Sequence, residues 1–234
     1  LSGVRERIGA EGETLTVAVE ATLHHRDAPN LETAVHRAIA ARIPEPGVAR
    51  LLQADARVWL YAFVRNKARF VQPGPAFHCW RHGANASNQI AFLVLVGVEI
   101  PIAHVLLSLY SPAVALVASV LSTYGWLFLY AEYRATLLRA TTLDDDAVHI
   151  RHGVLGDQRV PYATIAAVER VDVRPRRARG QLRFVGTVNA NLRLVLHPQA
   201  QLDTVLGRRP ISDIYLALDE PAAFAAELPP RLQG

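Results

Sequence analysis

Glu99 is the residue whose type and position most clearly point to chemistry, because it interrupts an apolar run. On insertion scales a charged Asp, Lys or Arg at the centre of a membrane helix costs roughly 2.5–3.5 kcal/mol, so an ionisable group there usually has a partner and often a function. Pro101 and His104 follow in the same run. Because proline has no N–H, Pro101 leaves the carbonyl of Gly97 without its helical donor.

Hydroxyl groups at a matching depth come from a second apolar run, which begins after Ser111. If the two runs form an antiparallel helical hairpin that turns near Ser111, Glu99 lies level with Ser122 and Thr123. At ~1.5 Å per residue, this level is roughly 18 Å along the helix from the turn. The sequence therefore predicts an intramembrane polar site made of Glu99, Pro101, His104, Ser122 and Thr123.

Two roles for this site remain open. Polar side chains commonly hold membrane helices together, so Glu99 fits a hydrogen bond across the hairpin or across an oligomer interface. The same carboxyl group fits an ion-handling, proton-handling or catalytic role. His104 is level with Ser119, but it is five residues from Glu99 and therefore about 140° away around the helix, so Glu99 and His104 do not pair directly.

A second group of candidate residues is a basic segment with four arginines, Arg174, Arg176, Arg177 and Arg179. In a domain held at a membrane surface, each such charge contributes about 1 kcal/mol to contact with anionic headgroups. The segment is therefore a candidate contact for anionic lipid. The alternative is a solvated loop between two strands.

The remaining reactive side chains give little indication of a metal centre or an enzyme. His78, Cys79 and His82 supply one thiol and two imidazoles, without a nearby fourth ligand of the kind a zinc site uses. We expect interfacial roles for them, and we predict no metal and no cofactor. The common signatures of nucleotide-binding proteins, serine hydrolases, metalloproteases and dithiol redox proteins do not occur.

The elements that position the polar site are two apolar runs, over residues 89–110 and 112–131, which predict a transmembrane hairpin. Each run is close to the ~20 residues that a helix needs to cross a membrane. The turn carries no basic residue, whereas basic residues flank the other ends, so both termini are predicted on the cytoplasmic side of a multi-pass protein. These flanking residues are Arg65, Lys67, Arg69, Arg81, Arg134 and Arg139.

Residues 1–76 form the predicted N-terminal cytoplasmic region of mixed and helical structure. Alternation over 13–24 favours a strand, with a helix as the alternative because Ala and Glu are frequent there. Asn30 is a predicted N-cap for a helix over 31–42. A second predicted helix, over 48–70, carries an apolar stripe and basic last turns. That pattern fits a helix on a membrane surface and equally a helix packed on its neighbour.

Residues 135–234, after the predicted hairpin segment 77–134, read as a β domain closed by a helix. Turn signals cover 143–146 and 153–158. A C-terminal helix is predicted with Asp219 as its N-cap and with Pro229 and Pro230 as its stop. The predicted strands are 147–151, 159–173, 191–197 and 211–218.

Two stretches of sequence resemble known bacterial proteins. The segment LDDDAVHIRHGVL over 143–155, followed by RVPY over 159–162 and by Ile165, resembles bacterial PH-like domains. The spans contain E-I-P-x-x-H at 99–104 and a Y-G to Y-R pattern at 124–134, and resemble uncharacterised bacterial membrane proteins in which a hairpin precedes such a domain. The resemblance covers about 77–228. It implies a bacterial inner-membrane location and an antiparallel β domain, and it carries over no catalytic residue.

Together these patterns predict an α+β membrane protein with a transmembrane helical hairpin and a C-terminal PH-like antiparallel β domain closed by a helix. The leading hypothesis is a membrane-anchored scaffold or regulatory subunit that binds a protein or lipid through that domain. The alternative is a small membrane enzyme or a proton- or ion-handling subunit centred on Glu99, which requires an oligomer or a larger partner because two spans enclose no pathway. Expected partners are the bilayer, a protein partner or second copies, and anionic lipid. A net charge of +4 is too small to favour nucleic acid.

Overall fold

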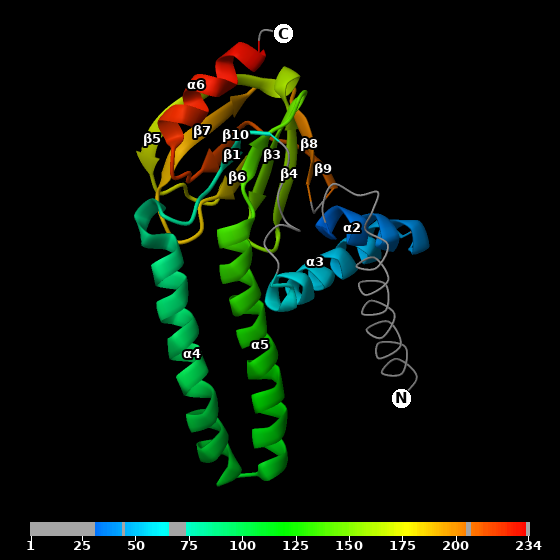
Figure 1. Ribbon diagram of the computed structural model, residues 1–234, viewed down its shortest axis with the longest axis vertical. Helices are drawn as coiled ribbons and strands as arrows, with labels where there is room; N and C mark the ends of the chain where they lie inside the picture. Colours follow the sequence, from blue (N-terminus) through cyan, green and yellow to red (C-terminus); the bar gives the residue numbers. More distant parts are fainter. Residues whose placement is uncertain (1–30, 44, 66–73, 205–206, 233–234) are drawn as a thin grey trace. The chain divides into compact units, whose positions relative to one another are not determined.

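The computed structural model describes residues 31–43, 45–65, 74–204 and 207–232 (Figure 1). The chain divides into two compact units, Leu1–Pro73 and Gly74–Gly234, which are treated separately below. The predicted strand over 13–24 and the predicted N-cap Asn30 lie outside the described residues.

Two helices of the first unit, α2 (Leu31–Arg42) and α3 (Pro46–Phe63), pack through a small apolar core. Val35 and Ile39 are four residues apart and buried, and so are Ala56 and Leu60. This contact fits a helix packed on its neighbour. The second helix is shorter than predicted, because it ends at Phe63 and the basic residues expected in its last turns are not part of it. Of these, Arg65 follows the helix, and Lys67 and Arg69 are not described.

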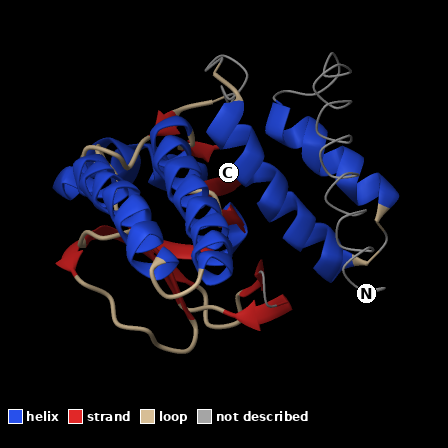
Figure 2. Ribbon diagram, turned by 90° about the horizontal axis from the view of Figure 1, so that it is seen from below, coloured by secondary structure: helices blue, strands red, loops and turns tan. Residues whose placement is uncertain are grey.

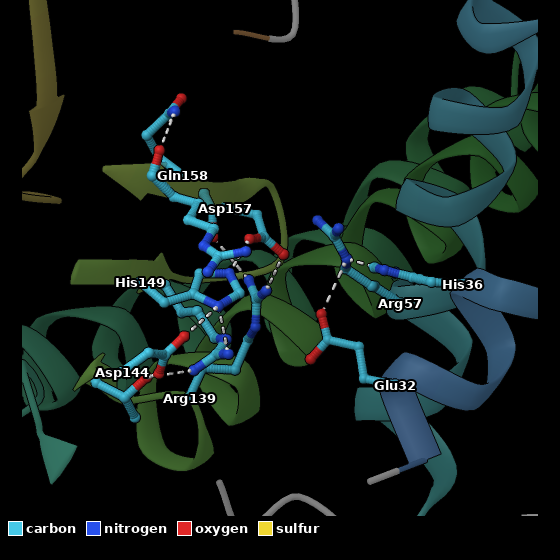
Figure 3. Close-up of polar contacts among 12 residues, drawn as sticks. Glu32, His36, Arg57, Arg139, Asp144, His149, Asp157 and Gln158 are labelled. Atoms are coloured by element: carbon cyan, nitrogen blue, oxygen red, sulfur yellow. Dashed lines mark hydrogen bonds and ion pairs between the residues drawn. The ribbon is translucent and has the colours of Figure 1, made fainter. Parts of the chain in front are cut away.

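A buried ion pair joins α2 to α3. The Arg57 Nε atom lies 3.1 Å from Glu32 Oε1 and donates to His36 Nε2 at 2.9 Å (Figure 3). The hydroxyl group of Tyr61 donates to Glu32 Oε2 at 2.7 Å. Several hydrogen bonds thus satisfy the charges of this pair, as burial of a charged group requires.

Two long helices, α4 (Asn85–Ser108) and α5 (Pro112–Leu138), form an antiparallel hairpin in the second unit. Both are long and apolar enough to cross a membrane. Figures 1 and 2 show them side by side. α4 begins and ends a few residues before the predicted span 89–110, whereas α5 begins at Pro112 as predicted and continues beyond residue 131 to Leu138. The Ser111 N–H donates to the Leu107 carbonyl at 2.9 Å and closes the turn.

The first sheet holds both ends of the hairpin. Its order is β1 (Ala76–Phe77), β2 (Thr141–Leu143), β3 (Ala147–His152) and β4 (Gly156–Pro161), and all of its pairs are antiparallel. β1 precedes α4 and β2 follows α5, and Ala76 pairs with Thr142. The backbone that enters the hairpin is therefore hydrogen-bonded to the backbone that leaves it.

The second sheet is mixed, not purely antiparallel as predicted. Its order is β5 (Ile165–Val173), β7 (Ala190–Leu196), β10 (Asp213–Leu216) and β6 (Gln181–Phe184), and β10 runs parallel to β6. A separate hairpin pairs β8 (Gln201–Thr204) with β9 (Gly207–Pro210). We refer to the two sheets, this hairpin and the C-terminal helix as the β domain.

The C-terminal helix α6 (Pro221–Leu232) covers the apolar core of the β domain. Phe224 and Leu228, four residues apart, are fully buried, and the Phe224 ring meets the Phe77 ring edge-on at 5.1 Å. The prediction that Pro229 and Pro230 stop the helix is wrong, because the helix includes both and reaches Leu232. Each proline removes only its own N–H, and these two positions lie near the end of the helix.

Two further predictions about the β domain are corrected. The run 159–173 is not one strand, because the 3₁₀ turn η4 (Tyr162–Thr164) divides β4 from β5. Tyr162 holds this corner, since its hydroxyl donates to the Asp144 carbonyl at 2.8 Å. Asp219 is not the cap of α6. Its carboxylate accepts from the backbone N–H groups of Arg81 and His82, at the 3₁₀ turn η3 (His82–Ala84) that leads into α4.

Candidate functional site

Three groups of polar residues are candidates for function: the polar residues of the α4–α5 hairpin, the junction between α5 and the β domain, and the arginines of the β domain. In the first group, Glu99 and Ser122 line a cavity of about 420 Å³ between α4 and α5. The side chain of Glu99 is exposed, and within the described chain it makes no hydrogen bond or ion pair. Thr123 is exposed and lies outside the cavity lining. A side chain at Gly125, on the cavity wall, would meet open space.

The two helices are joined by other residues of the hairpin. His104 Nδ1 lies 2.7 Å from the hydroxyl oxygen of Ser119, the residue placed level with it by counting from the turn. Deeper in the hairpin, Trp126 Nε1 donates to the carbonyl of Leu93 at 3.0 Å. Gly97 permits this approach, because a Cβ atom there would lie 3.0 Å from the indole nitrogen.

The five predicted intramembrane residues therefore do not form one cluster. His104 belongs to a helix–helix contact, whereas Glu99 faces an open cavity with Ser122. Trp126 was missed because its ring is an ordinary component of an apolar helix, and only the three-dimensional geometry shows that its N–H donates to the backbone of α4.

The junction centres on Arg139, the C-cap residue of α5, whose side chain is fully buried. Its guanidinium donates to the carbonyls of Gly153 at 2.6 Å and Gly156 at 2.8 Å, and to Asp157 Oδ2 at 2.9 Å. Sequence analysis assigned Arg139 only to the basic flank of the hairpin. Instead, it fixes the end of α5 to the β3–β4 turn (Figure 3).

Glu132 adds a second bond at the junction. Its carboxylate accepts from the Val154 N–H at 2.6 Å. Gly153 has a left-handed backbone with φ +57°, and a Cβ atom there would lie 1.8 Å from Glu132 Oε1. The turn therefore depends on glycine for both its conformation and its close approach to α5.

A chain of hydrogen bonds extends the junction into the first sheet. His149 Nε2 lies 2.6 Å from Asp157 Oδ1, and Arg151 Nη2 donates to His149 Nδ1 at 2.6 Å. Arg151 also donates to the Thr142 hydroxyl at 3.1 Å. These hydrogen bonds join the members of the network to one another, which suits a positioning role. In the described part of the chain, no group of three or more His, Cys, Asp or Glu residues is arranged to hold a metal ion.

Cys79 and His152 lie side by side, with Sγ 3.5 Å from Nδ1, but they do not form a reactive pair. Burial raises the pKa of the Cys79 thiol to about 12, and the charges of Asp219 and Glu132 add to this rise. Desolvation, with the nearby charge of Arg139, lowers the pKa of His152 to about 4. At neutral pH both groups are uncharged, whereas nucleophilic chemistry at cysteine needs the thiolate.

The third candidate is a cavity of about 880 Å³ in the β domain, which we call the arginine groove. Its lining includes residues of β4 and β6, each of which is one edge strand of its sheet. Its lining comprises residues 155–158, 177–184, 204 and 209–211, and includes Arg177, Arg179, Arg183 and Arg209.

The charge of the groove lining is unbalanced. Arg177, Arg179 and Arg209 make no ion pair with any described residue. The acidic residue in the lining is Asp157, which already accepts from Arg139 and lies against His149. The apolar side chains of Leu182 and Phe184 belong to the same lining and pack on the core. The groove therefore combines unneutralised cations with apolar residues.

Backbone contacts fix the loop that carries two of these arginines. Arg183 Nη1 donates to the Pro175 carbonyl at 3.0 Å, near the start of the loop. Ser212 N–H donates to the Gly180 carbonyl at 2.7 Å, where Gly180 has φ +76°. The loop is thus attached to β6 at one point and to the approach to β10 at the other.

The predicted arginine segment is only partly in the groove. Arg177 and Arg179 line it, whereas Arg174 and Arg176 do not. Arg183 and Arg209 were missed by sequence analysis, because they are far apart in the chain and follow no common motif. Only the folding of β6 and β9 toward one another brings them into the same cavity.

No family model matches the sequence, and searches of curated proteins and of solved structures find no match. Function is therefore inferred from the geometry of the groove, the hairpin and the junction.

Proposed function

We propose that the chain is a membrane-anchored scaffold or regulatory subunit whose β domain binds an anionic partner in the arginine groove. The observation that carries this proposal is the convergence of Arg177, Arg179, Arg183 and Arg209 on one cavity. Guanidinium groups form strong, often paired hydrogen bonds to carboxylates and phosphates. An anion that enters the groove meets cations that are not already paired with the described part of the chain.

The membrane anchor in this proposal is the α4–α5 hairpin. Over their most apolar stretches α4 has no buried residue and α5 almost none, whereas the core helix of a soluble protein would be mostly buried. The connecting turn exposes Leu109 and Tyr110 and carries no charge. We propose that the hairpin crosses a bacterial inner membrane, with both termini in the cytoplasm.

The β domain is proposed to be PH-like. Two sheets and a C-terminal helix that covers their core support this assignment. The parallel pairing of β6 with β10 departs from a purely antiparallel domain of that kind. A binding role for the groove does not depend on the family name, because function resides in the site and not in the fold.

A charge-reversal experiment tests the proposal on the full chain in a non-ionic detergent. Binding of fluorescein-labelled hexaglutamate and of dihexanoyl phosphatidylglycerol is measured for the wild type and for Arg177→Glu/Arg179→Glu. We expect saturable binding of at least one probe, with affinity at least about tenfold lower in the variant, equivalent to ~1.4 kcal/mol.

The matched control is Arg174→Glu/Arg176→Glu, which makes the same charge change in the same loop but outside the groove lining. We expect this control to lose less than about threefold in affinity, since it alters only the long-range field. If both double variants weaken binding equally, or if neither probe binds through the groove, the proposal is rejected.

A second candidate function is supported by Glu99, whose exposed carboxyl group lines a cavity without a partner in the described chain. An ion- or proton-handling role would need an oligomer, because two helices enclose no pathway. Proton flux into liposomes loaded with a pH-sensitive dye, compared between the wild type and Glu99→Gln, tests this role. Loss of proton flux with an unchanged oligomeric state supports handling of protons. Loss of the oligomer or of thermal stability supports a structural carboxyl group instead.

A further inference from the structure

We infer that the arginine groove accepts an extended acidic segment of a partner protein as an added β-strand. This inference rests on the proposed function, namely that the groove binds an anion, and names the chemical class of the partner. It follows from three features of the groove: its strand edges, the alternation of side chains along β6, and its charge.

Strand edges form two sides of the groove. In the described sheets, β4 and β6 each pair with one neighbour, β3 and β10 respectively. The outer side of an edge strand presents backbone N–H and C=O groups that the ladder leaves unpaired. The groove lining takes 156–158 from β4 and all of β6. An extended peptide in the groove therefore meets backbone donors and acceptors as well as side chains.

The side chains of β6 alternate between apolar and basic. Leu182 and Phe184 are partly buried against the core, whereas Arg183, between them, is exposed. An added strand shares the pleat of its neighbour, so residues opposite Leu182 and Phe184 face inward and a residue opposite Arg183 faces outward. The complementary segment alternates apolar and acidic residues.

The positive charge of the groove favours a segment with acidic side chains. Arg177, Arg179 and Arg209 stand around the same cavity as Arg183. Acidic side chains spaced two residues apart along an extended peptide meet successive cations, while the intervening apolar residues cover Leu182 and Phe184. A lipid headgroup would use the same cations but would leave the strand edges without partners, so the edges favour a peptide.

The test uses fluorescein-labelled Glu-Val-Glu-Val-Glu-Val-Glu, amidated at its C-terminus, with the full chain in a non-ionic detergent. Two further peptides carry backbone N-methyl groups, one on every valine and the other on every glutamate. Charge and side chains are retained in both, but each lacks the N–H donors along one edge of the strand. We expect at least one N-methylated peptide to bind at least tenfold more weakly than the parent.

The second measurement reverses the charge of two groove arginines and compares the affinities for an acidic and a basic peptide. Arg177→Glu/Arg209→Glu is expected to bind the glutamate peptide at least tenfold more weakly, and to bind Lys-Val-Lys-Val-Lys-Val-Lys more tightly than the wild type does. A melting temperature unchanged from that of the wild type excludes misfolding. Arg174→Glu/Arg176→Glu is the control, and it should not exchange the preference.

The outcomes distinguish this inference from the proposed function. If both N-methylated peptides bind as well as the parent, or if dihexanoyl phosphatidylglycerol binds through the arginines and the peptide does not, strand addition is overturned while anion binding stands. If no anionic probe depends on Arg177, the proposed function fails together with the inference. Loss of binding through one or both peptide edges, with exchanged charge preference, supports strand addition.

Discussion

The junction and the arginine groove use the same side-chain type in opposite ways. At the junction, Arg139 is buried and donates to two carbonyls and one carboxylate. In the groove, Arg177, Arg179 and Arg209 have no ion-pair partner in the described chain. A buried charge that is paired and hydrogen-bonded within the fold holds the fold together. Cations of one sign that gather without partners retain their capacity to bind something else.

The consequence is that substitutions in the two regions should affect different measurements. Removing one member of a buried, hydrogen-bonded set leaves the others desolvated and unpaired, which costs stability. Removing an exposed cation from a cluster of like charge costs little stability and changes binding. The four predictions that follow test this contrast, in order of decreasing effect.

The largest effect is expected for Arg139→Ala, which leaves Asp157 and the carbonyls of Gly153 and Gly156 without their shared donor. We expect a loss of about 3–5 kcal/mol in the free energy of unfolding. The measurement is thermal and denaturant unfolding of the full chain in detergent. An Arg139→Ala protein within about 0.5 kcal/mol of the wild type would show that the junction is not a stabilising element.

The second effect is a pH dependence due to His152. The unfolded chain takes up a proton at this imidazole near pH 6.5, whereas the native protein does so only near pH 4. The unfolded state therefore binds more protons between these values, and the free energy of unfolding falls as the pH is lowered through this window, by at most ~3 kcal/mol. Melting temperatures at pH 7, 5.5 and 4.5 measure the slope. His152→Gln should flatten it, and an unchanged slope in that variant would assign the effect to other groups.

The third effect separates two reasons for glycine at the junction. Gly153→Ala combines a strained left-handed backbone with a clash against Glu132, so we expect a loss of about 2 kcal/mol or more. Gly207→Ala is the comparison, because Gly207 also has positive φ but a Cβ atom there meets nothing within 4 Å. If unfolding measurements give equal losses in the free energy of unfolding for both variants, the clash with Glu132 contributes nothing to the loss at Gly153.

The smallest effect is expected for the groove. Arg177→Ala/Arg179→Ala should change the free energy of unfolding by less than about 0.5 kcal/mol, because neither side chain is paired within the described fold. The same unfolding assay measures it. A loss as large as that of Arg139→Ala would remove the contrast between the two regions and would make the groove arginines part of the structural core.

The elements that could be predicted from sequence are those whose own residue pattern indicates whether they face apolar or polar surroundings. The two apolar helices are evident from composition, and β7 is evident from alternation, with Leu192, Leu194 and Leu196 buried. The strands β6, β8 and β9 were missed, because they are short and β9 carries two arginines with no apolar alternation. Their positions are set by pairing with distant segments and not by local pattern.

The candidate sites follow the same rule. Glu99 is conspicuous because a carboxyl group in an apolar run is unusual, and half of the predicted arginine segment does reach the groove. Arg139 was read as a charge flanking a span, because nothing in its local sequence indicates that three acceptors from a later turn surround it. The prediction that Asp219 caps the C-terminal helix was wrong for a similar reason. Its carboxylate accepts from N–H groups in a segment about 140 residues earlier in the chain, which the local sequence does not indicate.

The pairing of β1 with β2 sets an order for biosynthesis. β1 leaves the ribosome before the hairpin and β2 leaves after it, so the first sheet cannot be completed until both helices have been made. Phe77, the second residue of β1, meets the ring of Phe224 only after α6 has also been made. A nascent chain whose helices are misplaced keeps this edge of the sheet open to proteases and chaperones. Closure of the sheet thus reports that both helices of the hairpin have been made.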